Sequence, residues 1–302
     1  MFTLFTMPKE FRGHFGKIQR NAILSWTRIH PRPEIILFGN EKGIAELAQE
    51  AGLRHVREVA RNDYGTPLIS DLFAKAQSLA AHEVLCYVNA DIILPRQFGL
   101  AVQRVASWKS RFLMVGNRFN VVLDQPEIYD SAEQESRLIA LVKSQNLPVW
   151  PGALDYFVFP RGQFTDIPPF AIGRGTWDNW FLWKSRSVGI PLIDATPVVL
   201  AIHQNHEYSY GIKPGEKWIW DGEEVKRNTQ LAHQDGCTDA CTIEDITHKL
   251  TPTRIRRDFR NRFIKYTRSM RRKLGLSKQN LESLKSRRKL ANKGEPSMKA
   301  SG

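Results

Sequence analysis

The strongest constraint on the fold is an apolar run at residues 84–88 that turns polar at Asn89 and Asp91 and is apolar again through residue 94. Such a run is typical of a strand buried on both faces, as central strands of parallel sheets are. Open α/β sheets bind their ligands outside the carboxyl ends of these strands. The pattern therefore indicates a ligand site at Asn89 and Asp91, and a simple strand-closing turn is the alternative.

Strand-like and helix-like segments alternate along the chain. Strands are predicted at residues 2–6, 34–38, 55–59, 84–94, 112–115, 153–160, 191–193 and 198–202. Helices are predicted at residues 18–29, 44–49, 66–79, from 95 onward, 130–145 as an insertion or lid, and 177–183, with Thr66 and Thr176 as N-caps. This order predicts an α/β fold with a doubly wound, mixed and mostly parallel sheet.

Composition narrows the class of protein. A chain of 302 residues with 42% hydrophobic residues can build one large α/β core. No apolar run reaches the roughly 18 residues of a membrane-spanning helix, and the start of the chain lacks the features of a signal peptide. Cys86, Cys237 and Cys241 are too few for a disulfide framework. We therefore expect a cytoplasmic protein.

The formal charge of +13 is concentrated at one end of the chain. Residues 251–302 hold seventeen Lys and Arg against three Asp and Glu, which leaves 27 against 28 for residues 1–250. Apolar residues at 259, 263, 270 and 274 are spaced as on one helix face, so residues 254–274 predict a basic amphipathic helix suited to an anionic membrane surface. A solvated, partly disordered extension is the alternative. Nucleic acid ranks lower because the main domain is not basic.

The tripeptide Asn89-Ala90-Asp91 resembles the Asp-x-Asp signature of nucleotide-sugar glycosyltransferases with the GT-A fold, similar to family 2, with Asn in place of the first Asp. The resemblance spans about residues 2–210. It implies a nucleotide-diphosphate-sugar donor, Mn²⁺ or Mg²⁺ bound by Asp91, and transfer to a hydroxyl of a glycan or lipid-linked acceptor at the cytoplasmic membrane face. It also implies a nucleotide-binding half at residues 1–125, an acceptor half at 126–250 and a basic helical tail at 251–302.

The same resemblance assigns roles to two later segments. In residues 173–182, with the sequence GRGTWDNWFL, Asp178 corresponds to the base that deprotonates the acceptor in an inverting transfer. The alternative is that Asp178 stabilises a helix start and that the tryptophans at 177, 180 and 183 belong to the core, although they also suit sugar stacking. His203 or His206 corresponds to the late histidine that completes the metal site or contacts the diphosphate.

Nucleotide contacts are implied at the end of the first strand and in the loop before the third helix. These positions hold Thr6, Met7, Pro8 and Asp63, and Asp63 is suited to a base or ribose donor, although its Asn-Asp-Tyr-Gly setting is equally that of a turn. Asn89 and Asp91 would contact the donor as well. Candidate phosphate partners are Arg12, Lys17, Arg118 and Arg174.

Two functions from other classes remain as alternatives. A nucleotidyltransferase that makes nucleotide sugars needs a Gly-rich basic loop after the first strand, which residues 11–17 only approximate. A non-catalytic basic protein would bind its partner through residues 251–302. A dehydrogenase is disfavoured because no Gly-x-Gly-x-x-Gly follows the first strand, and a zinc site at His233, Cys237, Cys241 and His248 lacks the usual paired-cysteine spacing.

Overall fold

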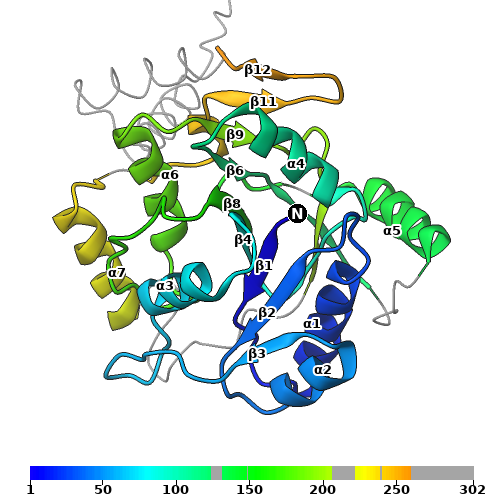
Figure 1. Ribbon diagram of the computed structural model, residues 1–302, viewed down its shortest axis with the longest axis horizontal. Coiled ribbons are helices and arrows are strands. Elements are labelled where there is room, and N and C mark those ends of the chain that lie inside the picture. Colours follow the sequence, from blue (N-terminus) through cyan, green and yellow to red (C-terminus); the bar gives the residue numbers. More distant parts are fainter. Residues whose placement is uncertain (124–130, 148, 206–221, 239, 260–302) are drawn as a thin grey trace, which may run out of the picture. The chain divides into compact units, whose positions relative to one another are not determined.

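The computed structural model describes residues 1–123, 131–147, 149–205, 222–238 and 240–259. Residues Met1–Asp258 form one compact unit (Figure 1). The predicted basic helix at 254–274 lies outside the described residues from position 260 onward. No helix within the described ranges has the length and apolarity that crossing a membrane requires.

Strands of the described residues form two sheets. The larger sheet has nine strands in the order β12-β11-β9-β6-β8-β4-β1-β2-β3, and the smaller has the order β5-β10-β7. The strands are β1 Thr3–Thr6, β2 Glu34–Phe38, β3 Arg54–Val56, β4 Val84–Val88, β5 Ile92–Ile93, β6 Leu113–Val115, β7 Arg118–Val121, β8 Tyr156–Pro160, β9 Leu192–Asp194, β10 Ala201–Gln204, β11 His248–Leu250 and β12 Ile255–Arg257. Most pairs in the larger sheet are parallel, and β8 runs antiparallel to both β4 and β6.

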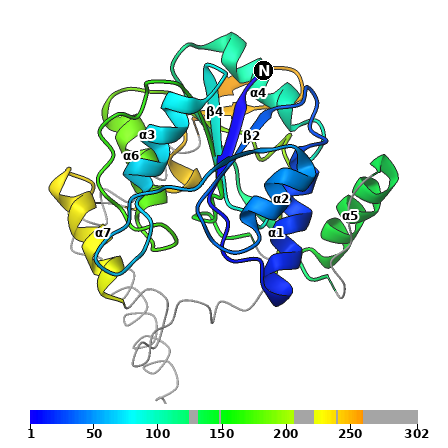
Figure 2. The ribbon, with the colours of Figure 1, turned by 60° about the horizontal axis from the view of Figure 1, so that its bottom comes forward.

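Helices cover both faces of the larger sheet, and Figure 2 shows α1 and α2 across it from α3 and α6. The helices are α1 Gly13–Trp26, α2 Ile44–Ala51, α3 Ile69–Leu79, α4 Phe98–Trp108, α5 Ala132–Gln145, α6 Trp177–Ser187 and α7 Glu223–Gln234. One core cluster takes apolar side chains from α1, α2, α4 and α5, and the other takes them from α3, α6 and α7. This arrangement confirms the predicted mixed, mostly parallel α/β fold.

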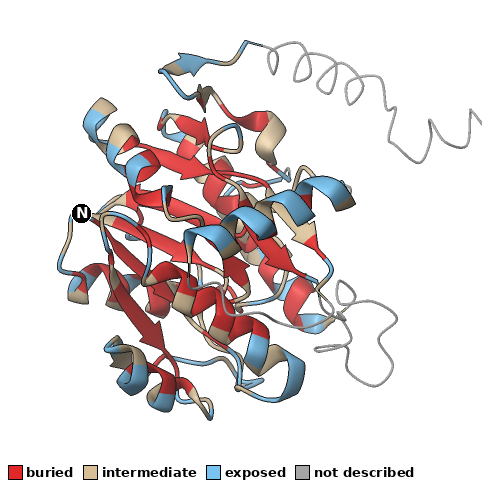
Figure 3. Cartoon of the chain, turned by 90° about the vertical axis from the view of Figure 1, so that its right-hand side faces the viewer, coloured by how far each residue is buried: buried red, intermediate tan, exposed pale blue. Residues whose placement is uncertain are grey.

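Burial follows the apolar pattern of the sequence. The strands through the middle of the sheet are buried along their length, while the helices expose their outer faces (Figure 3). In α1, the predicted spacing of Ile18, Ala22 and Trp26 forms the buried stripe. Burying an aromatic or aliphatic side chain of this size contributes roughly 1.5–3 kcal/mol. Packing of these buried side chains thus holds the strands, and therefore the residues at their ends, in place.

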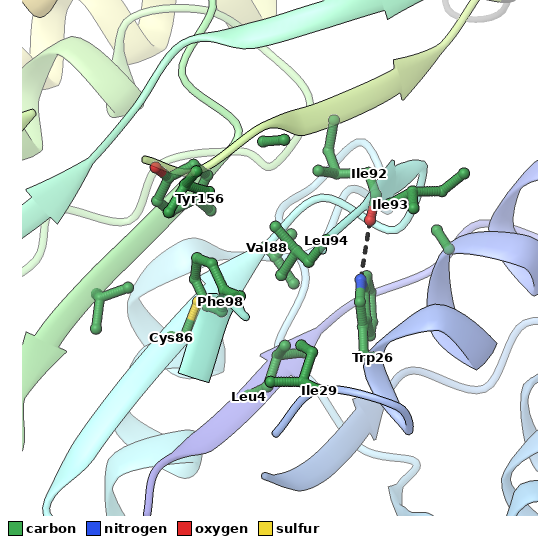
Figure 4. Close-up of a cluster of buried hydrophobic side chains, with 14 of the residues drawn as sticks. Leu4, Trp26, Ile29, Cys86, Val88, Ile92, Ile93, Leu94, Phe98 and Tyr156 are labelled. Atoms are coloured by element: carbon green, nitrogen blue, oxygen red, sulfur yellow. Dashed lines mark hydrogen bonds between the residues drawn. The ribbon is translucent and has the colours of Figure 1, made fainter. Parts of the chain in front are cut away.

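The connection after β4 is itself part of the core. Ile92, Ile93 and Leu94 pack with Val88 and Phe98, and the Trp26 indole donates a hydrogen bond of 2.9 Å to the Ile92 carbonyl (Figure 4). Ile92 and Ile93 also pair with β10. Because the residues on both sides are buried, the short polar segment between them has a defined position.

Several local predictions are wrong at the ends of elements. Thr66 is not the N-cap of α3, because Pro67 forms a bridge with Arg61 and the helix starts at Ile69. Thr176 is at the N-cap of α6, but its side chain makes no capping bond. Residues 255–257, expected in the basic tail, form β12 and pair with β11. Helix α5, in the segment predicted as an insertion or lid, begins at Ala132 and packs through Leu138 and Val142.

Candidate active site

Asn89 and Asp91 lie at the carboxyl end of the fully covered strand β4, as the sequence predicts. The Ile92 N–H donates to the Asn89 carbonyl at 3.2 Å, which closes a tight turn around Asp91. The Gln204 side-chain amide, buried behind this turn, lies 2.8 Å from the Ile18 carbonyl and 3.4 Å from the Asp91 carbonyl. The Asp91 side chain is 22% exposed, so a ligand can reach it.

An antiparallel neighbour brings a further carboxylate to this point. Because Val88 pairs with Tyr156, Asp155 lies opposite Asn89, whose N–H donates to the Asp155 carbonyl at 2.9 Å. The Asn89 amide nitrogen donates to Asp155 Oδ1 at 2.6 Å, and the Tyr87 hydroxyl donates to Asn89 Oδ1 at 2.9 Å. Arg118 on β7 forms an ion pair of 3.2 Å with the same Asp155 carboxylate. Both ends of the Asn89 amide are therefore used.

His203 faces Asp91 from inside β10, not from a strand end as predicted. It is 1% exposed, and its Nε2 lies 3.5 Å from Asp91 Oδ2. Its Nδ1 lies 3.1 Å from the side-chain oxygen of Asn120, so Nδ1 is the nitrogen that donates. His203 Nε2 and Asp91 Oδ2 therefore lie side by side, and both are atoms that can bind a metal ion.

Asp178 occupies the first turn of α6, as expected, and the turn before it is strained. Thr176 has a φ of 86°, which is rare for a residue with a branched Cβ. The Thr176 hydroxyl lies 3.2 Å from the hydroxyl of Thr229 on α7. The buried Asn228 side chain donates to the carbonyls of Ala171, Arg174 and Gly175. Helix α7 therefore holds the loop that delivers Asp178.

The Asp178 carboxyl is surrounded by protein although the residue keeps an intermediate exposed area. Burial raises its pKa to about 6, with the Asp155 charge adding to the rise, while the Asn179 N–H opposes it. Tyr87 connects Asp178 to the β4 loop, since its ring packs edge-on against Trp177 at 5.5 Å. Burial raises the pKa of Tyr87, and the charges of Asp91, Asp155 and Asp178 add to this. The charges of three carboxylates thus act on one tyrosine hydroxyl.

Arg174 is held by a buried carboxylate. Its Nε and a terminal guanidinium nitrogen each lie 3.1 Å from Glu224 Oε2, and Glu224 is 3% exposed. Burial alone would raise the pKa of Glu224, but hydrogen bonds from Thr66 and Asn62 and the Arg174 charge hold it below its ordinary value. Lys9 is exposed as a residue, but partial desolvation of its ammonium group lowers its pKa, while the Asp91 charge opposes this and the Arg174 charge adds to it. Lys9 is therefore within electrostatic reach of both Asp91 and Arg174.

The predicted nucleotide contacts lie in two places. Thr6 and Pro8 are buried at the end of β1, next to the parallel strand β4, and no hydrogen-bond partner satisfies the Thr6 hydroxyl among the described residues. Asp63 is 92% exposed and lies 3.5 Å from Arg227, but its neighbour Asn62 bonds Glu224. Thr6 and Pro8 thus lie at the same sheet edge as Asn89 and Asp91. Asp63 lies on a separate loop, and Glu224 contacts both that loop, through Asn62, and Arg174.

Other sequence candidates take structural positions. Trp177 and Trp180 are core residues, and Lys17 and most of the 11–17 segment belong to α1. Cys237 and Cys241 are buried, and burial raises the pKa of Cys241 to about 11. His248 packs against Trp108 at 4.9 Å. His206 lies outside the described residues.

Sequence reasoning missed the supporting residues of the site: Tyr87, Asn120, Asp155, Glu224 and Asn228. The one available signal for Asp155 was its place just before the apolar run of β8, which resembles the place of Asn89 after β4. The others come from segments distant in the sequence.

No protein-family model matches this sequence, and no curated protein matches it. Solved structures of glucosyl-3-phosphoglycerate synthase from Mycobacterium tuberculosis are similar to it. A complex with Mn²⁺, uridine-diphosphate-glucose and phosphoglyceric acid has 14% identity and a TM-score of 0.43, covering 69% of this chain and 73% of that chain. A second structure of that enzyme has 13% identity and a TM-score of 0.43, covering 78% and 77%. At these values the function has to be inferred from the chain's own residues.

Proposed function

We propose that the protein transfers a sugar from a nucleotide-diphosphate-sugar donor to a hydroxyl group. The observation that carries this proposal is that a pair of possible metal ligands and a possible base lie at one edge of the sheet. Asp91 and His203 face each other across 3.5 Å, and Asp178, with a pKa raised to about 6, shares the Tyr87 surroundings with Asp91. The first pair suits a diphosphate-bound cation, and the second group suits a base.

The donor set fits a divalent cation that receives most of its ligands from the substrate. Among the described residues, no group of three or more His, Cys, Asp and Glu side chains is arranged to hold a metal ion. Asp91 and His203 would hold Mn²⁺ or Mg²⁺ together with diphosphate oxygens and water, which is how Mg²⁺ is commonly bound. Such a cation would take up negative charge on the departing diphosphate.

Asp178 has the properties of a general base. A carboxylate with a pKa near 6 is ionised at neutral pH and accepts a proton more readily than an ordinary aspartate. We infer that it deprotonates the acceptor hydroxyl as that oxygen attacks the anomeric carbon, with inversion. The base would then carry the proton while the diphosphate leaves with the electrons of the broken glycosidic bond.

Lys9 and Arg174 would stabilise the leaving diphosphate from the protein side. Lys9 is within electrostatic reach of both Asp91 and Arg174, and Glu224 fixes the Arg174 guanidinium. Because residue 89 is Asn, the β4 turn offers a cation one carboxylate. The cation would then be held less tightly by the turn, and basic side chains would offset a larger share of the diphosphate charge. The buried Thr6 hydroxyl and Pro8 would border the nucleotide, and Asp63 would contact its base or ribose from the 61–66 loop.

The acceptor we propose is a glycan or lipid-linked hydroxyl at the cytoplasmic membrane face. Its only support is the basic sequence of residues 254–274. The nucleotidyltransferase alternative loses support because residues 13–17, its candidate phosphate loop, are the first turn of α1.

Calorimetric titration with UDP, GDP, ADP and dTDP, each with and without Mn²⁺, tests the proposal. One diphosphate should bind, and Mn²⁺ should strengthen its binding. Asp91→Asn should remove most of the Mn²⁺ effect, whereas Asp166→Asn, on an exposed aspartate elsewhere, should leave it unchanged. If no diphosphate binds the wild-type protein, the proposed donor site is wrong.

A further inference from the structure

The most informative cluster beyond the reacting groups is the hydrogen-bonded set of Tyr87, Asn89, Asp155 and Arg118. We propose that Asp155 supplies from β8 the carboxylate that residue 89 lacks, and that its bond to Asn89 positions the turn carrying Asp91. Asp155 is then a positioning residue. The part of this proposal that concerns a cation rests on the proposed function, and the part that concerns the Asn89–Asp155 pair does not.

The first step is the pattern of donors and acceptors around residue 89. Its side chain accepts from the Tyr87 hydroxyl at 2.9 Å and donates to Asp155 Oδ1 at 2.6 Å. An amide can do both, whereas a carboxylate accepts only. Aspartate at position 89 would therefore place two carboxylate oxygens at hydrogen-bond distance with no proton between them. The carboxylate of Asp155 therefore explains why residue 89 is an amide and not a second carboxylate.

The second step is the support of Asp155 itself. Its side chain is 8% exposed, and the Arg118 guanidinium lies 3.2 Å from one oxygen and 3.3 Å from the other. A buried carboxylate with a hydrogen-bonded arginine keeps one orientation. The Asn89 N–H also bonds the Asp155 carbonyl, so backbone and side chain fix the same pair of residues.

The third step connects this pair to the opposite side of Asp91. Arg118 and Asn120 are two residues apart on β7 and therefore point to the same face. Arg118 reaches Asp155, and Asn120 reaches His203, which faces Asp91. Strand β7 thus holds both partners of the turn, Asp155 at Asn89 and His203 at Asp91.

An exchange of the two side chains tests the proposal. Asn89→Asp alone should lower the melting temperature by roughly 5 °C, because it places two carboxylates in contact. Asp155→Asn alone should have at least as large an effect, because it takes the paired carboxylate away from the largely buried Arg118 guanidinium. The double variant again has one amide donating to one carboxylate, so it should recover most of the loss caused by Asn89→Asp.

Glu34→Gln provides the matched control. Glu34 is a half-buried carboxylate that accepts from Thr3 and lies 3.5 Å from Arg54 at the amino end of β2, the opposite edge of the sheet. Added to Asn89→Asp, it should not restore stability. If the effects of Asn89→Asp and Asp155→Asn simply add in the double variant, or if Asn89→Asp is as stable as the wild type, the pairing is refuted.

Titration with Mn²⁺ in the presence of whichever of UDP, GDP, ADP and dTDP binds the wild-type protein separates positioning from stability. Asp155→Asn should weaken Mn²⁺ binding by roughly tenfold, as loss of a group that orients a ligand does, while Glu34→Gln should not change it. Unchanged Mn²⁺ affinity in Asp155→Asn would refute the positioning role. A wild-type protein that binds no Mn²⁺ in the presence of that diphosphate would refute the metal part of the proposed function, and the exchange experiment would still decide whether Asn89 and Asp155 act as a pair.

Discussion

Asp178→Asn should make the protein more stable at neutral pH while it removes transfer activity. In the folded protein, burial raises the pKa of Asp178 from 3.8 to about 6. The folded state therefore holds a proton between about pH 4 and 6 that the unfolded chain releases. The stability from this proton is complete below about pH 4 and is lost as the pH rises through 6.

The magnitude follows from the size of the shift. A rise of about two pKa units corresponds to about 3 kcal/mol between the protonated and the ionised side chain. Asparagine carries no charge, and its Oδ1 can still accept the 2.9 Å hydrogen bond from the Asn179 N–H. At pH 7.5 the variant should therefore gain up to about 3 kcal/mol in the free energy of unfolding, which is roughly 6–12 °C in melting temperature for a domain of this size.

Thermal and urea unfolding of both proteins at pH 4 and pH 7.5 would measure this. The difference should be large at pH 7.5 and close to zero at pH 4. Asp166→Asn, which removes an exposed carboxylate, should show little change at either pH. An Asp178→Asn protein that is no more stable than the wild type at pH 7.5, or equally stabilised at both values, would refute the burial of this charge.

Three further outcomes are expected. The turnover rate should fall about tenfold from its plateau to pH 5, because about one Asp178 carboxyl in ten is then ionised, and a rate profile flat from pH 5 to 8 would exclude Asp178 as the base. Glu224→Gln should lower the free energy of unfolding by about 2 kcal/mol and raise the KM for the donor, because Arg174 loses its charged partner. An unchanged KM would show that Arg174 does not contact the donor. Truncation after Asp258 should leave nucleotide binding intact and abolish binding to acidic liposomes. Truncation after residue 250 also removes β12 and should lower the melting temperature. Liposome binding by the protein that ends at Asp258 would refute the role given to the basic segment.

The parts of the site that lie on one apolar run could be predicted from the sequence. The buried strand β4 and the polar turn at Asn89 and Asp91 follow from local pattern, because burial on both faces leaves only the strand end for polar groups. The helix start after Thr176, which puts Asp178 in the first turn of α6, was also predicted from local pattern, whereas the role of Asp178 came from the family resemblance. The predicted strand at residues 34–38 matches β2 residue for residue.

The residues that were missed depend on pairing between distant segments. Asp155 meets Asn89 only because β8 lies antiparallel to β4, 66 positions along the chain, and no local signal carries that register. His203 was expected at a strand end, but pairing with β5 and β7 extends the strand through Gln204. Thr66 has the sequence of an N-cap, but a loop bond to Asn62 and a tertiary bond to Glu224 decide its conformation.

The direction of β8 explains why this turn has an asparagine. A parallel neighbour of β4 would bring its carboxyl end to the site, whereas an antiparallel neighbour brings its amino end, where Asp155 lies. The Tyr87 hydroxyl is already near three carboxylates, those of Asp91, Asp155 and Asp178. A fourth at position 89 would add repulsion that Arg118, already paired with Asp155, is poorly placed to offset. With the second carboxylate just before β8 and not in the β4 turn, negative charge stays near the proposed cation and the turn keeps an amide that fixes its shape.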